Sequence, residues 1–268
     1  MTVQSITSDQ EKQFRRFVED MYHHALKEVN PDKEGLQRLF ARGGEFHVQG
    51  VATIRRLTAK TPDYDLARTI LGKDFISPEE IAKSRKIVYT DEQFAAFGDT
   101  LPAQDVLEWF RDNGFMLVAG PPKEMSLLDI RALHAPYFYS KEGGWYANEK
   151  ETFARNDKAT TAWIALRKEP VPDSLNKNWD EQQALLSEFE VVPNAAATTW
   201  AVTTYKAVMG FYLLKNVYVR TSSRDSDGVR VVVGRFDDTG LDVGSYWGDD
   251  RVSSLGIVSV RESRTLNP

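Results

Sequence analysis

The chain has 268 residues and not one of them is cysteine. This absence excludes disulfides, thiolate nucleophiles, cysteine-ligated zinc and iron–sulfur clusters. Histidine is also scarce, since the four histidines all precede residue 135. His23 and His24 are adjacent, so on a helix they point about 100° apart and do not form the i, i+4 pair that holds a metal. We therefore expect no metal centre and no catalytic residue of the cysteine or histidine type.

A net positive charge and long apolar runs are lacking as well. The net charge is -5 and the isoelectric point is near 5.5, which gives no overall attraction to phosphate or to anionic lipid. No apolar run approaches the length of a membrane span, and the first residues lack a basic segment followed by an apolar one. We expect a soluble, cytoplasmic protein with neither nucleic acid nor membrane as a partner.

What is present is a series of short helices. Apolar residues three and four positions apart predict a helix over residues 8–29, and a second short helix follows over residues 32–41. Serine, threonine or proline marks the predicted starts of three more helices, at Ser77, Thr90 and Leu101. Further helices are predicted over residues 126–133, 179–188 and 194–209. The last of these is apolar on more than one side and is expected to pack on a sheet.

Strand signals concentrate towards the C-terminus. Between residues 210 and 264, apolar runs alternate with turns that contain aspartate and glycine, a pattern typical of a meandering antiparallel sheet. Earlier strands are predicted over residues 115–119 and 163–167, and an extended segment over residues 46–54. The predicted fold class is α+β, with a mostly helical region over residues 1–134. A mixed region over residues 135–268 would hold a twisted antiparallel sheet flanked by two helices, and both regions could form one continuous globular unit.

The mixed region resembles a known fold. The run Tyr218-Val219-Arg220-Thr221-Ser222-Ser223, the hairpin that continues to Arg235, and the terminal Gly256-Ile257-Val258-Ser259-Val260-Arg261 are similar to elements of the bacterial C-type-lectin fold. That group includes formylglycine-generating-enzyme-like domains and variable proteins diversified by retroelements. The resemblance implies a lectin-like sheet in which the strands between the last helix and the terminal strand present a ligand surface.

Departures from those families disfavour their chemistry. The tryptophan that usually precedes the Ser-Ser element is absent, and Tyr218 is the nearest aromatic residue. The oxidase branch depends on paired cysteines, which the chain lacks. The iron-dependent branch needs a histidine cluster, whereas all histidines here lie outside the lectin-like region. The resemblance therefore implies binding rather than catalysis.

The binding residues that this reading predicts lie on one strand and on one connector. They are Tyr218, Arg220, Tyr246, Trp247, Asp249, Asp250 and Arg251. Aromatic anchors beside a polar loop are typical of binding hot spots, and the ligand would be a protein or a glycan. The alternative is a loop whose Trp247 is buried and whose acidic residues are merely solvated.

Other hypotheses stay open at this point. Acidic turns could bind calcium through oxygen ligands, but the Asp-Ser-Asp-Gly turn lacks the pattern of a twelve-residue calcium loop and is explained by hairpin formation. Our leading hypothesis is a non-enzymatic recognition protein without a cofactor. The alternatives are a structural or assembly protein of a phage or mobile element, and a carboxylate-dependent hydrolase. The sequence does not predict the oligomeric state.

Overall fold

The computed structural model describes residues 7–45, 50, 64–140 and 142–261. Its contacts divide the chain into two compact units, Met1–Ala59 and Lys60–Pro268. The boundary suggested by the sequence, near residue 134, falls inside the second unit. The reason is that strand β2 (Phe115–Ala119) pairs along its whole length with β3 (Trp163–Arg167), which joins the two predicted regions in one sheet. The extended segment predicted over residues 46–54 lies outside the described residues, apart from Gly50.

The described part of the first unit includes the helices α1 (Ser8–Val29) and α2 (Lys33–Ala41). Both were predicted from the sequence. Thr7 begins α1 with a capping box, in which its side chain accepts from the Gln10 backbone N–H and the Gln10 side chain accepts from the Thr7 backbone N–H. Asn30 ends α1 in the left-handed conformation, a position where asparagine is tolerated. Neither helix contains a buried residue.

The second unit contains most of the helices. They are α4 (Asp65–Leu71), α5 (Pro78–Arg85), α6 (Asp91–Asp99), α7 (Gln104–Asp112), α8 (Leu127–Leu133), α9 (Phe153–Asn156), α10 (Trp179–Gln183) and α11 (Ala195–Met209). Capping boxes at Ser77, Thr90 and Ser126 begin α5, α6 and α8, as the sequence predicted for the first two. The helix predicted over residues 179–188 ends earlier, at Gln183, because a turn closed by the Glu190 side chain on Ser187 follows it.

Two sheets form the β part of this unit. The first has the order β1-β2-β3-β9-β4, and the second has the order β7-β6-β5-β8. Besides β2 and β3, the strands are β1 (Phe75–Ile76), β4 (Glu190–Val191), β5 (Tyr218–Arg224), β6 (Arg230–Asp237), β7 (Gly240–Tyr246), β8 (Leu255–Ile257) and β9 (Val260–Arg261). The fold is therefore α+β, as predicted.

The C-terminal region was predicted to hold a twisted antiparallel sheet, and the structure divides its strands between two sheets that are mostly antiparallel. The terminal segment pairs parallel with β5 through Leu255 of β8, and after two intervening residues it pairs antiparallel with β3 through Val260 of β9. One short stretch of chain therefore belongs to both sheets. The hairpins β5–β6 and β6–β7 are antiparallel, as the aspartate- and glycine-containing turns predicted.

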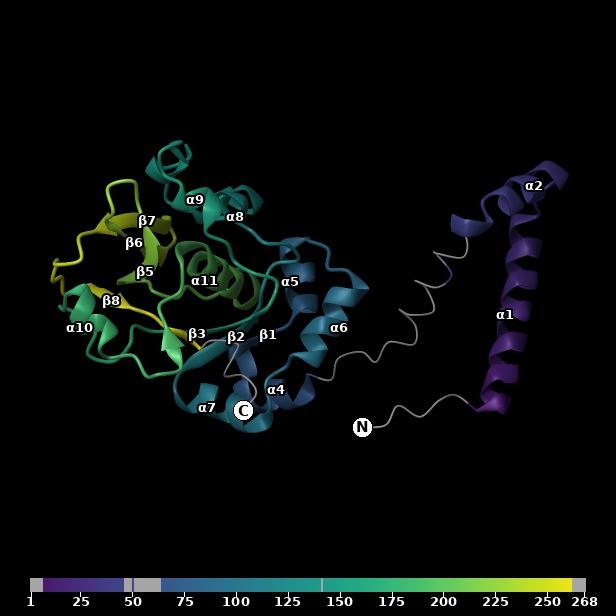
Figure 1. Cartoon of the computed structure of the whole chain (residues 1–268), viewed down its shortest axis with the longest axis horizontal. Helices are drawn as coiled ribbons and strands as arrows, with labels where there is room; N and C mark the ends of the chain where they lie inside the picture. Colours follow the sequence, from purple (N-terminus) through teal and green to yellow (C-terminus); the bar gives the residue numbers. More distant parts are fainter. Residues whose placement is uncertain (1–6, 46–49, 51–63, 141, 262–268) are drawn as a thin grey trace. The chain divides into compact units, whose positions relative to one another are not determined.

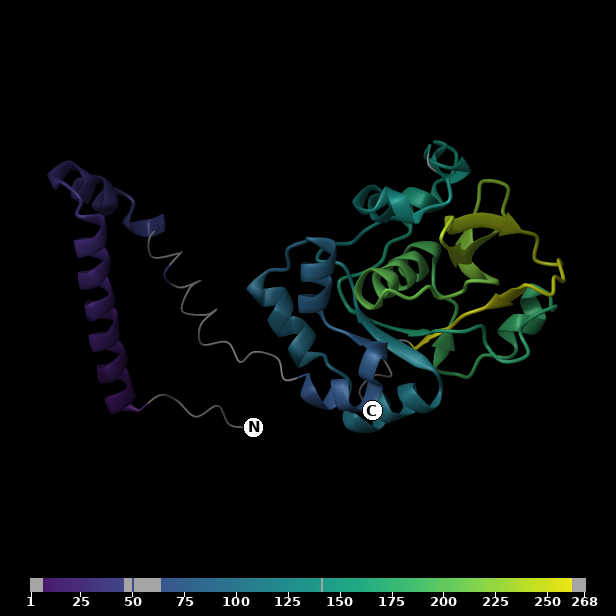
Figure 2. The ribbon, with the colours of Figure 1, turned by 180° about the vertical axis from the view of Figure 1, so that it is seen from behind.

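Helix α11 lies between the two sheets (Figures 1 and 2). Ten of its fifteen residues are buried, and it contacts strands of both sheets as well as α5 and α8. Its small alanine and threonine side chains let the surrounding elements approach closely. Trp200 at its centre is fully buried and donates from Nε1 to the Ala119 carbonyl of β2 over 2.9 Å. The predicted packing of this helix on a sheet is confirmed, and the helix also contacts a second sheet.

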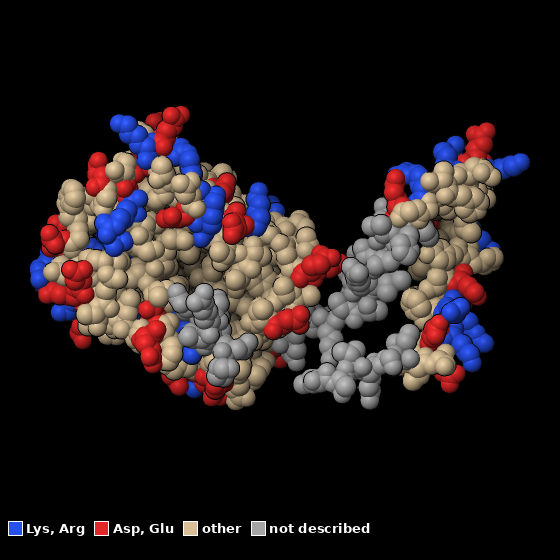
Figure 3. All heavy atoms as spheres, in the orientation of Figure 1, with Lys and Arg blue, Asp and Glu red and all other residues tan. Residues whose placement is uncertain are grey.

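Charged side chains of both signs are interspersed on the face of the second unit drawn in Figure 3. This face has no broad area of one sign. Among the described helices, none combines the length and the apolar character that crossing a bilayer requires.

The buried carboxylate of Glu190 links the short strand β4 to β3 and to the residue before β9 by hydrogen bonds. Glu190 Oε1 accepts from Arg167 Nη2 of β3 over 3.1 Å and from Ser259 Oγ, just before β9, over 2.5 Å. Glu190 Oε2 accepts from the backbone N–H and the hydroxyl of Ser187 over 3.2 and 2.8 Å. Burial alone would raise the pKa of Glu190, but the hydrogen bonds from Ser259, Ser187 and Arg167 outweigh it and lower the pKa from 4.5. The ionised carboxylate thus stabilises the edge of the first sheet.

This lowered pKa predicts a pH-dependent stability. A group whose pKa is lower in the folded state contributes its full stabilisation above the unfolded-state pKa and loses it as pH falls through the folded-state pKa. Glu190→Gln should therefore reduce the free energy of unfolding by about 1–3 kcal/mol near neutral pH. The difference from the parent chain should shrink steadily below pH 4.5. Urea titrations of the variant and the parent chain over a pH series measure the two free energies of unfolding. A difference between them that stays constant across acidic pH would contradict the stabilising role of the ionised Glu190.

Candidate functional site

The connector from β7 to β8 forms a closed turn beside α10, at the left of the ribbon in Figure 1. Trp247 donates its backbone N–H to Asp250 Oδ2 over 2.8 Å, and Asp250 donates its own N–H to the Trp247 carbonyl over 3.2 Å. The Gly248 carbonyl accepts from the Trp179 N–H at the first turn of α10 over 2.9 Å. These bonds fix the backbone of the connector, while the side chains of Trp247, Asp249 and Arg251 are exposed.

Trp247 is the exposed aromatic of this connector. Its exposed fraction is 62 %, so the alternative of a buried Trp247 is wrong. Asp249 is exposed as well, whereas Asp250 is half-buried because its carboxylate closes the turn. A large aromatic side chain on a fixed backbone loses little conformational freedom when it binds, which is typical of a recognition anchor.

Arg220 lies beneath the connector and holds it in place. Its side chain is fully buried, and its guanidinium donates to the carbonyls of Trp247 and Asp250 over 2.8 and 2.7 Å. It also donates to the Lys177 carbonyl over 3.1 Å and to Gln182 Oε1 over 2.8 Å, both at α10. Burial lowers the pKa of Arg220, and Asp250 opposes that shift. Arg220 thus supports the surface from below, and its burial leaves no side-chain area for a ligand.

Tyr218 has a similar supporting position two residues earlier on β5. It is 9 % exposed, and its ring lies 5.9 Å from that of Tyr246 at an interplanar angle of 54°. Its hydroxyl donates to the carboxylate of Asp242 on β7. Burial, followed by this hydrogen bond, raises the pKa of Tyr218. The two tyrosines that the sequence singled out are therefore neighbours across the second sheet.

Residues that the sequence analysis missed complete the surface. The Arg230 guanidinium lies 3.8 Å from the centroid of the Trp179 ring, and Arg230 is paired with Tyr246 in the β6–β7 register. Burial and the nearby Arg224 and Arg220 lower the pKa of Arg230 to about 10. No sequence signal links Trp179 or Arg230 to the connector, because α10 and β6 reach it only in three dimensions.

An ion pair connects the same helix to the end of the connector. Arg251 Nη1 lies 2.5 Å from Glu181 Oε2, and the two side chains are 50 % and 39 % exposed. The pKa of Glu181 is lowered by the N–H of the capping residue Asn178 and by Arg251. We call the assembly the Trp247 surface and define it by the residues Trp179, Glu181, Arg230, Tyr246, Trp247, Asp249 and Arg251. It combines three aromatic rings with charges of both signs.

The acidic turns have structural roles in the hairpins. Asp225 Oδ1 accepts from the backbone N–H groups of Asp227 and Val229, and Asp237 Oδ1 accepts from the N–H and hydroxyl of Thr239. In the part of the chain that the structure describes, no three acidic or histidine side chains gather into a metal-binding group. The turn chemistry accounts for these carboxylates.

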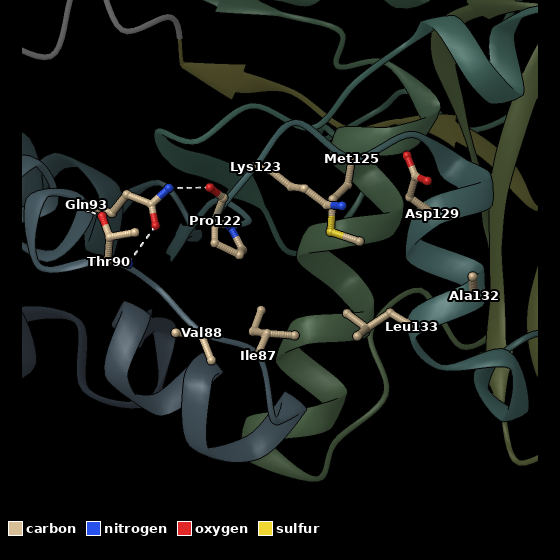
Figure 4. A pocket seen from close by; sticks show the side chains of 10 residues that line it. All are labelled: Ile87, Val88, Thr90, Gln93, Pro122, Lys123, Met125, Asp129, Ala132 and Leu133. Atoms are coloured by element: carbon tan, nitrogen blue, oxygen red, sulfur yellow. Dashed lines mark hydrogen bonds between the residues drawn. The ribbon is translucent and has the colours of Figure 1, made fainter.

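A pocket of about 560 Å³ lies elsewhere in the second unit, between the start of α6 with the loop before it, and α8 with the loop before it (Figure 4). Its volume suits a small ligand. Its lining is mostly apolar and consists of Ile87, Val88, Thr90, Gln93, Pro122, Lys123, Met125, Asp129, Ala132 and Leu133. The Gln93 amide is already occupied, since it donates to the Pro122 carbonyl and accepts from the Thr90 N–H.

Asp129 is the carboxylate among these lining residues. Its Oδ2 accepts from the backbone and hydroxyl of Ser126 over 2.9 and 2.7 Å at the start of α8. These bonds lower the pKa of Asp129, with further contributions from Lys158 and Lys123. An ionised, capping carboxylate without a second acid beside it does not provide the acid and base pair of a hydrolase.

Comparison with family models, with curated proteins and with solved structures finds no match to this chain.

Proposed function

We propose that the protein is a recognition protein that binds a protein or glycan ligand at the Trp247 surface without transforming it. The observation that carries this proposal is the exposure of Trp247 on a backbone that a buried arginine holds fixed. A tryptophan without a binding role would not require a buried arginine to hold the backbone beneath it. Preorganised aromatic anchors flanked by arginine are the composition of binding hot spots.

The lectin-like part of the proposal rests on the arrangement of the C-terminal region. Strand β3 opens this region, and the terminal strand β9 pairs with it antiparallel. Between them come α10, α11 and the meander β5–β7, in the order that the resemblance implies. Apart from Trp179 and Glu181 on α10, the residues of the Trp247 surface lie on the strands and connector between the last helix and the terminal strand, where the resemblance implies a ligand surface.

The hydrolase alternative receives less support. Every described carboxylate whose pKa clearly departs from its usual value has that pKa lowered, whereas a general acid needs a raised one. The assembly alternative differs from recognition in that it requires a large self-contact through this surface rather than a separate ligand.

The test compares two variants, Trp247→Ala and Phe211→Ala, each of which truncates an aromatic side chain of similar exposure. Trp247→Ala should weaken binding to hits from a glycan array and a displayed-peptide library at least about tenfold, because hot-spot truncations cost more than about 1–2 kcal/mol. Its melting temperature should stay within about 2 °C of the parent, since the side chain is exposed. Phe211→Ala is the control, because Phe211 is 63 % exposed at the end of α11, away from the connector.

Equal binding by Trp247→Ala and the parent chain would refute the proposal. An equal loss of binding in Phe211→Ala would refute it as well, since a general reduction of exposed apolar surface would then explain the weaker binding of both variants. A chain that binds no member of either library, while Trp247→Ala lowers the melting temperature strongly, would assign Trp247 a structural role instead.

A further inference from the structure

Helix α1 carries an apolar stripe whose large side chains keep much of their surface exposed. Residues three and four positions apart align along one side of the helix: Phe14, Phe17, Val18, Met21, Tyr22, Ala25, Leu26 and Val29. Phe17 is 61 % exposed and Val29 73 % exposed, and no residue of α1 or α2 is buried. An amphipathic helix of 22 residues with this pattern normally packs against another apolar surface.

The exposed area is large enough for an interface between two chains. A large apolar side chain offers about 150–250 Å². Given their exposed fractions, Phe14, Phe17, Met21, Tyr22, Leu26 and Val29 leave on the order of 600 Å² of apolar surface on each chain. Two copies would bury about 1,200 Å² together, which reaches the range of specific protein interfaces.

The order of the apolar residues favours a particular partner. The stripe is symmetric about the Met21–Tyr22 bond, so an antiparallel second copy would place apolar residues level with apolar residues throughout. The pairs are Phe14 with Val29, Phe17 with Leu26, Val18 with Ala25, and Met21 with Tyr22. Two-fold symmetry of this kind is the usual basis of a homodimer.

The charges along the polar side agree with the same arrangement. Antiparallel pairing places Arg15 level with Glu28, and Glu19 and Asp20 level with the two histidines. Arg16 and Lys27 are level as like charges, but they lie on the side of the helix opposite the stripe and point away from the second copy. A parallel, in-register pair would instead set each of these charges beside its own copy. Antiparallel helices also bring opposite ends of their dipoles together.

A lipid surface fits the helix less well. Helices that lie on membranes carry a polar face rich in lysine and arginine, which attracts anionic lipid. Helix α1 has five acidic and four basic residues, and both signs are mixed on this unit in Figure 3. The balance of charge favours a self-complementary protein contact.

We propose that two copies of the chain associate through an antiparallel pairing of their α1 helices, centred on Met21 and Tyr22. The pairing is an isologous interface, in which each apolar residue of one copy packs against its counterpart in the other. It is independent of the Trp247 surface, which belongs to the second unit.

The first test is the oligomeric state of the full chain. Sedimentation equilibrium over about 1–100 μM should give a dimer for the parent chain, a range that covers typical homodimer affinities. Phe17→Glu should weaken the dimer more than about 100-fold, because each copy would bury an unpaired charge in the interface. Lys12→Glu is the control, since Lys12 lies on the polar side, 74 % exposed in its side chain, and should leave the dimer intact.

The second test determines the direction of pairing. The chain has no cysteine, so introduced thiols are the only ones. In the antiparallel dimer, two copies of Phe14→Cys hold their thiols about 22 Å apart along the helix axis. A short bis-maleimide should therefore not join Phe14→Cys to itself or Val29→Cys to itself, but should join the two variants when they are mixed.

Several outcomes would overturn the proposal. A monomer across the whole concentration range would do so, and then binding of that monomer to liposomes of anionic lipid would identify a membrane as the occupant. A dimer that survives Phe17→Glu would place the interface elsewhere. Efficient joining of Phe14→Cys to itself would show a parallel pair. None of these results depends on whether Trp247 binds a ligand.

Discussion

Replacing Arg220 with alanine is expected to lower the free energy of unfolding by about 3–5 kcal/mol, because it leaves several buried hydrogen-bond acceptors without a donor. The guanidinium donates to three backbone carbonyls and to Gln182, and no part of its side chain is exposed. Without it, the carbonyls of Lys177 and Asp250 would stay desolvated, each at a cost of about 1–3 kcal/mol. Urea unfolding followed by circular dichroism measures the change.

Arg251→Ala provides the matched control for this prediction. Arg251 also joins the connector to α10, but its pair with Glu181 is exposed, with half of the Arg251 side chain accessible to solvent. Exposed pairs contribute at most about 1 kcal/mol. A similar small loss for both variants would contradict the supporting role of Arg220. If Arg220→Ala folds at low temperature, its connector should also bind any ligand of the Trp247 surface more weakly, because the backbone under Trp247 would no longer be fixed.

Arg220 and Arg251 illustrate a property that the sequence does not predict, namely the burial of a polar side chain. Both arginines were predicted as binding residues, since both lie in polar stretches beside aromatic ones. The two arginines differ in burial, since Arg220 is buried and Arg251 is exposed. Arg220 is buried because α10 and the residues just before it, about forty positions earlier in the chain, pack over its side chain. The alternation of Tyr218, Val219 and Arg220 predicts which side chains share a face of β5, but not which face another element covers.

Features with local causes were predictable. The capping boxes at Ser77 and Thr90 are encoded within four residues, and the α5 and α6 starts follow from them. The hairpin turns depend on neighbouring aspartate and glycine in the same way. The parallel pairing of β5 with β8 has no such local cause, because it joins segments more than thirty residues apart. For the same reason Trp179 and Arg230, which meet the connector only in the folded chain, could not be assigned to the site.

Combining the two proposals gives the molecule a simple division of roles. Each second unit would present one Trp247 surface, and paired α1 helices would hold two such units in one particle. Two linked surfaces bind a ligand with repeated epitopes more tightly than one, without any new contact, provided that the linker spans the epitopes. Both Trp247 surfaces depend on an intact second unit, in which the buried helix α11 contacts both sheets.

Trp200→Ala is expected to destabilise that unit by about 3–5 kcal/mol, the usual cost of truncating a large buried side chain whose cavity does not collapse. Trp200 is fully buried in α11 and bonds the Ala119 carbonyl of β2. Its ring also lies 4.6 Å from the Arg85 guanidinium of α5. Burial lowers the pKa of Arg85 to about 10, and its Nε and Nη1 atoms have no hydrogen-bond partner. Arg85 Nη2 still donates to Thr203 Oγ1 over 2.6 Å. Removing the ring would therefore also deprive a desolvated cation of its aromatic contact.

Trp200→Phe separates these contributions. The smaller ring still fills much of the space and can still face Arg85, but it loses the Nε1 hydrogen bond, so we expect a loss of about 1–2 kcal/mol. Chemical unfolding of both variants, monitored by circular dichroism, provides the measurement. Losses below about 1 kcal/mol for Trp200→Ala would mean that neighbouring side chains fill the space. The packing between the two sheets would then not depend on α11 as the contacts of Trp200 indicate.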